Sequence, residues 1–141
     1  MNLYFSREIR QNDALRGAYN ALTERTFGFS FEAWYRMGYW GDFHVPYALF
    51  DGGRAVANVS VNRMEVLFDG AVRQCFQLGT VMTDPACRRR GYARRLVEIP
   101  CSCLPTGASW IFIPGSAFRK GSSTGFPCAR RRPPGWGNSW I

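Results

Sequence analysis

The chain has 141 residues, of which 46% are hydrophobic and 16% aromatic, so its size and composition predict one globular domain with its own core. No stretch approaches the roughly 20 apolar residues of a membrane span, and the first residues lack the basic and apolar regions of a secretory signal. The formal net charge is +8, but residues 101–141 carry five basic residues and no acidic one. We therefore expect a cytoplasmic protein without a membrane partner, and the net charge alone does not indicate nucleic-acid binding.

Cysteine usage predicts reduced thiols and no metal site. The number of cysteines is odd, without the spacing of a disulfide framework: Cys75, Cys87, Cys101, Cys103 and Cys128. Cys101 and Cys103 would make half of a zinc site, but the chain has one histidine, His44, and no second close cysteine pair.

Two helices are predicted in the first 40 residues. Asn12 and Asp13 can cap a helix that Gly28 ends, with apolar residues at helical spacing: Leu15, Ala18, Tyr19 and Leu22. Ser30 is the predicted cap of a second, shorter helix, which Gly38 stops.

Three strands and a further helix follow. A strand over residues 46–50, a turn at Asp51-Gly52-Gly53 and a strand over residues 55–67 indicate a β-hairpin. Asp69-Gly70 turns the chain into a strand over residues 72–83, and an amphipathic helix begins after Gly91. The predicted order is α-α-β-β-β-α.

Residues 78–96 contain the most informative pattern. An apolar β-type run ends at Thr83, the Asp84-Pro85 turn follows, and a basic loop with one glycine, Gly91, leads directly into a helix. The first amides of a helix lack partners within it and carry partial positive charge, so this order predicts an anion site. Each positive side chain near this helix N-terminus is unfavourable by roughly 0.3–1 kcal/mol, because it opposes the helix dipole, and a bound anion would offset this cost. Five are present: Arg88, Arg89, Arg90, Arg94 and Arg95.

Two other interpretations of this segment stay open. One is a solvated arginine cluster at the start of a surface helix, and the other is a nucleic-acid contact, which the charge distribution disfavours. The strand that precedes the cluster and the apolar Leu96 and Val97 that follow it favour the anion site.

Residues 88–93 read R-x-x-G-x-A and resemble the acyl-CoA pyrophosphate loop, Q/R-x-x-G-x-G/A, of the GCN5-related N-acetyltransferase (GNAT) family. The segments Thr-Phe-Gly-Phe near residue 28, Ala-Asn-Val-Ser-Val-Asn at 57–62 and Gln-Leu-Gly-Thr-Val-Met-Thr at 77–83 are similar to bacterial members, and the resemblance covers about residues 3–98. It implies an α/β protein with the GNAT (acyl-CoA N-acyltransferase) fold, a mixed and mostly antiparallel sheet flanked by helices, incomplete at the C-terminus.

The resemblance also implies acetyl-CoA as co-substrate. The backbone of the fourth strand would pair with the pantetheine arm, and the loop amides and arginines would hold the pyrophosphate. The cofactor-binding residues implied in this way are Val81, Met82, Thr83, Arg88, Arg89, Arg90, Gly91, Tyr92, Ala93 and Arg94.

Catalytic residues are less clearly marked. An acceptor amine must lose a proton before it attacks a thioester, and the candidate bases are His44, Asp42 and Glu65. An aromatic cluster is either the acceptor-side wall that the second helix supplies in the family or ordinary core packing: Trp34, Tyr35, Tyr39, Trp40 and Phe43. Cys87 adjoins three arginines, but a nucleophilic role is not expected because the family transfers acetyl directly.

The chain changes character near residue 100. Pro100 is expected to cut the last helix short, and of the following residues only 109–113 have a strand-like pattern. We expect residues 1–100 to form the N-terminal two-thirds of a GNAT domain and residues 101–141 to be a basic, poorly ordered tail rich in Pro, Gly and Ser. This segment is either a divergent tail or the product of a reading-frame change near codon 99. No tyrosine follows Tyr92, so the general acid usual in the family has no counterpart.

Three functions are compatible with these observations. The first is an N-acetyltransferase that acts on a small-molecule or peptide amine, with homo-oligomerisation left open. The second is a truncated GNAT remnant that binds CoA with weak or no turnover. The third is a basic nucleic-acid-binding module.

Overall fold

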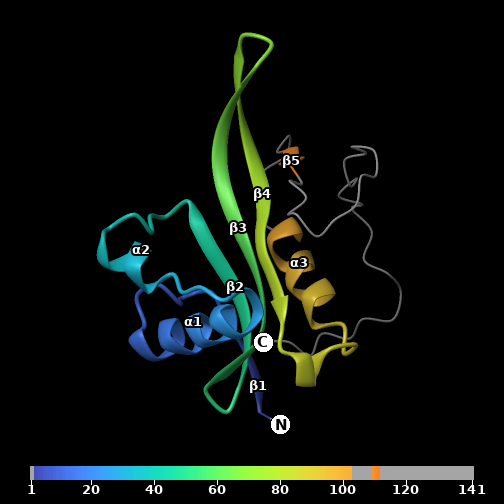
Figure 1. Ribbon diagram of the computed structural model, residues 1–141. Helices are drawn as coiled ribbons and strands as arrows, with labels where there is room; N and C mark the ends of the chain where they lie inside the picture. Colours follow the sequence, from blue (N-terminus) through green and yellow to red (C-terminus); the bar gives the residue numbers. More distant parts are fainter. Residues whose placement is uncertain (1, 103–108, 112–141) are drawn as a thin grey trace.

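The computed structural model describes residues 2–102 and 109–111, and a sheet runs through its centre (Figure 1). The elements, in chain order, are β1 (Leu3–Ser6), α1 (Asp13–Phe27), α2 (Glu32–Arg36), β2 (His44–Asp51), β3 (Arg54–Phe68), β4 (Ala71–Thr83), the 3₁₀ turn η1 (Pro85–Cys87), α3 (Tyr92–Ser102) and β5 (Ser109–Ile111). Apart from the end of α3 and β5, the predicted tail over residues 101–141 lies outside the described residues.

The sheet has the predicted mixed, mostly antiparallel character. Its strand order is β1-β2-β3-β4-β5, with antiparallel pairing from β1 to β4 and parallel pairing between β4 and β5. The three strands of the two predicted hairpins are confirmed, although β2 begins at His44, two residues earlier than expected. β1 was not predicted, because four residues with exposed Tyr4 and Phe5 show no alternation from which a strand could be inferred.

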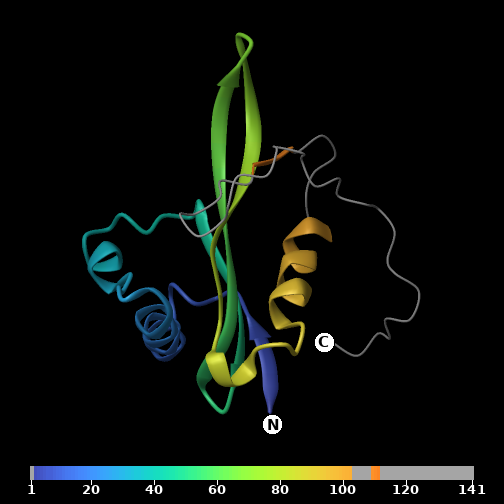
Figure 2. The ribbon, with the colours of Figure 1, turned by 45° about the vertical axis from the view of Figure 1, so that its right-hand side comes forward.

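Helices cover both faces of the sheet. The two views place α1 and α2 on one face and α3 on the other (Figures 1 and 2). The core is accordingly divided in two. Residues of α1 pack with β2, β3 and β4 in one cluster, which includes Tyr19, Leu22, Phe50 and Met82. On the opposite face Leu96 of α3 packs with Leu49, Val56, Ala57, Val59 and Tyr92.

The predicted helix ends are confirmed in α1. The side chain of Asn12 accepts a hydrogen bond from the Leu15 amide at 3.1 Å, and Gly28 ends the helix with a left-handed φ of 78°. Before α2, the Ser30 hydroxyl accepts from the Glu32 amide at 3.2 Å, but the N-cap residue is Phe31, one position later than predicted. Gly38, with φ 77°, lies just beyond the end of that helix.

The expectation that Pro100 shortens the last helix is wrong. α3 continues to Ser102 with Pro100 inside it. Pro100 is buried, and Leu96 one turn earlier is fully buried against the sheet. The packing of the apolar face therefore outweighs the loss of one backbone hydrogen bond at the proline.

β3 and β4 extend beyond the rest of the sheet as a two-stranded ribbon. Pairing of β2 with β3 ends at Asn62, whereas β3 and β4 remain paired as far as Phe68 and Ala71. The ribbon projects clearly in both views (Figures 1 and 2). Leu67 is 72% exposed at its tip, so the ribbon adds little to the core.

Within the described residues, no helix is long and apolar enough to cross a membrane.

The two-sided core predicts a contrast between two leucines. Leu96→Ala removes a fully buried side chain from the α3 cluster and should lower the free energy of unfolding by about 2–5 kcal/mol. Leu67→Ala at the exposed ribbon tip should change it by less than about 0.5 kcal/mol. Urea unfolding followed by circular dichroism measures both, and equal losses would contradict the assignment of α3 to the core.

Candidate functional site

β4 carries a bulge close to its C-terminal end. Val59 pairs with Val81 and Val61 pairs with Leu78, so Gly79 and Thr80 together face Ser60 alone. Among the described residues, pairing of β4 with β5 covers only Cys75–Gln77, which precedes the bulge. Bulges bend a strand and redirect its backbone groups, and here the redirected segment begins two residues beyond the β4–β5 pairs that the described residues form.

A buried group of polar side chains fixes the bulge from the α1 side. The Asn58 amide donates to the Thr80 carbonyl at 2.9 Å, and the hydroxyls of Ser60 and Thr80 are 2.9 Å apart. The Tyr19 hydroxyl lies 3.3 Å from the Thr80 hydroxyl, and burial raises the pKa of Tyr19, so the phenol stays neutral. A Cβ at Gly79 would lie 3.1 Å from the Asn62 amide nitrogen, so a larger residue there would press on the Asn62 side chain.

Asp84 holds the connection that leaves β4. Its carboxylate is buried and accepts from the Ala86 amide at 3.1 Å, while Arg25 of α1 and Arg54 of β3 approach the other oxygen at 3.2 and 2.5 Å. Its own amide donates to the Val56 carbonyl at 2.8 Å. Burial alone would raise the pKa of Asp84, but the Ala86 amide and the two guanidinium groups hold it below its usual value.

The arginine loop and the first turn of α3 follow directly. Arg89 and Gly91 both have left-handed backbone conformations, with φ of 64° and 74°. The first helical hydrogen bond runs from the Arg95 amide to the Gly91 carbonyl at 3.1 Å, so Tyr92, Ala93 and Arg94 form the N-terminal turn.

The side chains of this loop are largely open to solvent. Arg88, Arg89 and Arg90 are exposed, whereas the Tyr92 ring is buried under the sheet. A hydrogen bond with the Tyr92 hydroxyl raises the pKa of Arg90. Arg94 forms an exposed ion pair with Glu98 at 3.6 Å.

The residues predicted to bind the cofactor therefore form one continuous stretch at one end of the sheet. Val81, Met82 and Thr83 end β4, and after η1 residues 88–94 form the loop and the first turn of α3. The Met82 side chain is buried in the α1 cluster, whereas that of Val81 is 42% exposed. Only the backbone of Met82 is thus available to a ligand.

A cavity of about 490 Å³ lies on the α2 side of the bulge. Its lining includes aromatic side chains from the α2 region and polar residues of β2, β3 and β4, among them Phe31, Trp34, Phe43, His44, Asn62 and Thr80. The cavity thus reaches the bulge at Thr80.

His44 is the one candidate base that lines this cavity. Its Nδ1 lies 2.6 Å from the Asn62 side-chain oxygen, and the Asn62 amide nitrogen donates to the Gln77 oxygen at 3.2 Å. Asn62 therefore presents an acceptor to His44, which places the imidazole proton on Nδ1. Burial lowers the pKa of His44, so Nε2 carries a lone pair at neutral pH, and within the described structure Nε2 is buried without a hydrogen-bond partner.

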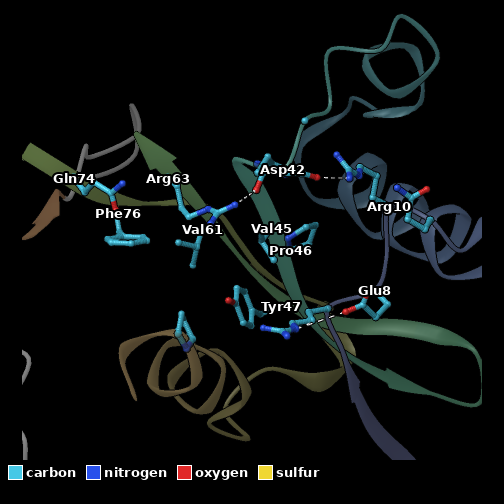
Figure 3. Close-up of a pocket in the computed structure, with 15 residues that line it drawn as sticks. Glu8, Arg10, Asp42, Val45, Pro46, Tyr47, Val61, Arg63, Gln74 and Phe76 are labelled. Carbon is cyan, nitrogen blue, oxygen red and sulfur yellow. Dashed lines mark hydrogen bonds and ion pairs between the residues drawn. The ribbon is translucent and has the colours of Figure 1, made fainter. Parts of the chain in front are cut away.

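The other two candidate bases are exposed. Asp42 pairs with Arg10, and its backbone carbonyl accepts from Arg63 at 2.9 Å. It lines a second cavity of about 600 Å³ that adjoins Pro100 of α3 (Figure 3). Glu65 lies on the ribbon opposite Gln74 and lines neither cavity.

The predicted aromatic cluster is divided between the core and the lining of the cavity. Trp40 is buried in the core and donates its indole N–H to the His44 carbonyl at 3.1 Å, and Tyr35 packs against the same core. Trp34 and Phe43 line the cavity, whereas Tyr39 is 64% exposed and lines neither cavity.

Sequence reasoning missed two sets of residues. Asp84 was interpreted only as part of a turn, and its contacts with Arg25 and Arg54 involve sequence separations of 59 and 30 residues. Asn58 and Asn62 are four residues apart on a predicted strand. Because side chains alternate between the two faces of a strand, this even separation places both on one face. That this face is buried rather than solvated could not be inferred from the strand itself.

The described residues contain no group of three or more His, Cys, Asp or Glu side chains that could hold a metal ion.

Comparisons with known proteins give one result for the sequence and several for the fold. Residues 8–99 match the family model described as an acetyltransferase (GNAT) domain. A search of curated proteins found no match. Three solved structures are similar in fold, and each covers more than four-fifths of this chain.

The first is an aminoglycoside acetyltransferase from an uncultured soil metagenomic sample, 18% identical, with a TM-score of 0.61 over 83% of this chain and 82% of that one. An acetyltransferase of Trypanosoma brucei is 14% identical, with a TM-score of 0.64 over 87% and 96%. Glucosamine-6-phosphate N-acetyltransferase of Arabidopsis thaliana is 15% identical, with a TM-score of 0.60 over 82% and 84%. At these identities the likeness concerns the fold.

The contacts of Asp84 predict a pH-dependent loss of stability. Asp84→Asn removes the charge that faces Arg25 and Arg54 and should lower the free energy of unfolding by about 1–3 kcal/mol near neutral pH. Because the pKa of Asp84 is lowered on folding, its contribution is complete above the ordinary value of about 3.9 and is lost as the pH falls through the lower folded value. Urea unfolding near neutral pH and near pH 3 tests this, with the exposed Asp69→Asn as control. An Asp84→Asn effect of the same size at both pH values would contradict it.

Proposed function

The chain belongs to the GNAT acetyltransferase family, and we propose that it transfers an acetyl group from acetyl-CoA to an amine acceptor by direct attack. The observation that carries the proposal is the arrangement around the end of β4. A helix N-terminus rich in arginine follows the strand on one side, and a cavity with a buried imidazole reaches its bulge on the other.

The CoA end of the proposed site is the continuous stretch from Val81 to Arg94. Acetyl-CoA would lie along the backbone of Val81–Thr83, in the manner of an added strand. Its pyrophosphate would meet the amides of residues 89–94, where the helix dipole and the exposed Arg88 and Arg89 favour negative charge. The left-handed Gly91 has no heavy atom within 4 Å of the position of a Cβ, so the backbone there is open to close approach.

The acceptor end is the cavity that contains His44. The acceptor nitrogen must be neutral to attack, because an ammonium group has no lone pair. We assign His44 Nε2 to take that proton, directly or through one water, since its pKa is lowered and Nδ1 is held by Asn62. As the new C–N bond forms and the C–S bond breaks, the thiolate leaves and takes a proton from solvent.

A second candidate function is CoA binding with little turnover. The observation that favours it is the absence of any tyrosine after Tyr92, so the thiolate lacks the general acid expected from the family resemblance. General acid assistance typically contributes about 10²–10⁴-fold. Binding of CoA without thiol release from acetyl-CoA and a panel of amines would favour this second function.

The CoA loop is tested by Gly91→Asp. This change places a side chain and a negative charge where the pyrophosphate is proposed to lie, and should weaken CoA binding at least tenfold by isothermal titration. Gly70→Asp at the ribbon tip is a matched control, because Gly70 has φ 73° against 74° for Gly91 and neither position has a heavy atom within 4 Å of its Cβ. If both variants bind CoA as the parent chain does, the loop is not the site.

The role of His44 is tested by His44→Gln. Loss of the base should lower kcat by about 10²–10⁴-fold, while thermal unfolding and CoA titration show whether the fold and the loop are intact. In the parent chain the rate should rise with pH through a pKa below about 6.5 and be level near neutral pH, because the imidazole must be unprotonated. The variant should lack this inflection. Loss of the same inflection in Asp42→Asn or Glu65→Gln would contradict the assignment.

A further inference from the structure

The cavity beside the bulge has a largely aromatic wall centred on Trp34. The Trp34 ring lies 5.8 Å from that of Phe31, 5.8 Å from that of Phe43 and 5.4 Å from that of His44, measured between centroids. Phe31 also lies 5.3 Å from the His44 ring. Trp34 and Phe31 are only partly buried, so their ring surfaces are available to a ligand next to the imidazole. The volume of about 490 Å³ is in the range of small-molecule sites.

The same cavity contains no carboxylate. Among the residues that the structure describes, no Asp or Glu lines it, and its charged lining residue is Arg63. Three carboxylates are next to lining residues in the sequence. Glu32 is paired with Arg16 and Arg36, and Asp42 with Arg10. Glu65 follows the lining residue Met64 on a strand, so its side chain lies on the opposite face of the strand, and it is exposed. A ligand with several positive charges would therefore find Arg63 and no counter-ion.

The remaining polar lining groups are neutral and few. The Asn62 and Gln77 side chains are bonded to each other, and His44 Nε2 is buried without a hydrogen-bond partner among the described residues, so it can accept one proton. One ammonium group can be stabilised by the faces of Trp34 and Phe31 and then lose its proton to His44. The chemistry of the wall thus matches one amino group attached to an apolar body.

We propose that the acceptor is a primary monoamine with an apolar body about the size of an aromatic ring, bound against Trp34, and that polycationic amines are excluded. This inference rests on the proposed function, because it concerns the acceptor of that reaction. It also separates the chain from the aminoglycoside acetyltransferase whose fold it shares, since aminoglycosides carry several amino groups.

Direct binding to the full chain tests this inference independently of turnover. 2-Phenylethylamine, 2-aminoethanol and spermine are each titrated calorimetrically, with and without saturating CoA. We expect 2-phenylethylamine to bind at least tenfold more tightly than either of the others. Equal or tighter binding of 2-aminoethanol or spermine would overturn the proposal.

Two variants locate the binding. Trp34→Ala should weaken 2-phenylethylamine about tenfold, whereas Tyr39→Ala, an exposed aromatic in the same region that lines neither cavity, should leave it unchanged. Gln77→Glu keeps an oxygen for the Asn62 amide and adds a carboxylate, so it should raise the affinity for spermine. Equal effects of the two aromatic variants, or no gain with Gln77→Glu, would place the amine elsewhere and overturn the proposal.

Turnover then separates this inference from the proposed function. Binding of 2-phenylethylamine at Trp34 with no thiol release from acetyl-CoA would refute the proposed acetyl transfer and leave the amine site standing. Thiol release that is faster with spermine than with 2-phenylethylamine would support acetyl transfer and refute the acceptor class.

Discussion

The carboxylate of Asp84 connects the three parts of the chain on which the proposed site depends. It receives Arg25 from α1, Arg54 from β3 and the Ala86 amide from the segment that leaves β4. A buried charge is costly unless it is paired, and here the pairing comes from both the helical layer and the sheet. The position of the arginine loop relative to the end of β4 therefore follows from the folding of elements far away in sequence. The loop is held from its first residue, while the side chains of Arg88 and Arg89 are exposed.

β4 separates the two halves of the proposed reaction. Toward α1, the Asn58–Thr80 hydrogen bond holds the bulge against β3, and Gly79 leaves room for the Asn62 amide. Toward α2, the same bulge forms one wall of the cavity that we assign to the acceptor. Toward its C-terminal end, the strand continues into the loop that we assign to CoA. In the proposed reaction, this one irregularity in the pairing would bring the acyl donor and the acceptor to neighbouring stretches of the same strand.

The sequence predicted those elements that depend on neighbouring residues, and it did not predict those that depend on contacts between distant parts of the chain. The Asn12 cap, the Gly28 end of α1 and the turn at Asp69-Gly70 depend on neighbouring residues, and these were predicted correctly. β1 is too short to show a pattern, and continuation of α3 through Pro100 depends on packing against the sheet. For the site, the order of strand, loop and helix was predictable from residues 78–96. The environment of His44 was not, because its neighbours Phe31, Asn62 and Gln77 come together only in the folded sheet.

The left-handed conformation of Arg89 has a consequence for how this sequence can change. An arginine with φ of 64° occupies a region that glycine adopts at lower energy, and its charge lies beside the positive end of a helix. Both properties make the loop less stable than a glycine-rich or acidic alternative would be. Selection for thermal stability alone would therefore tend to replace this arginine early. If related sequences keep an arginine at this position, the comparison of those sequences would itself indicate selection for anion binding.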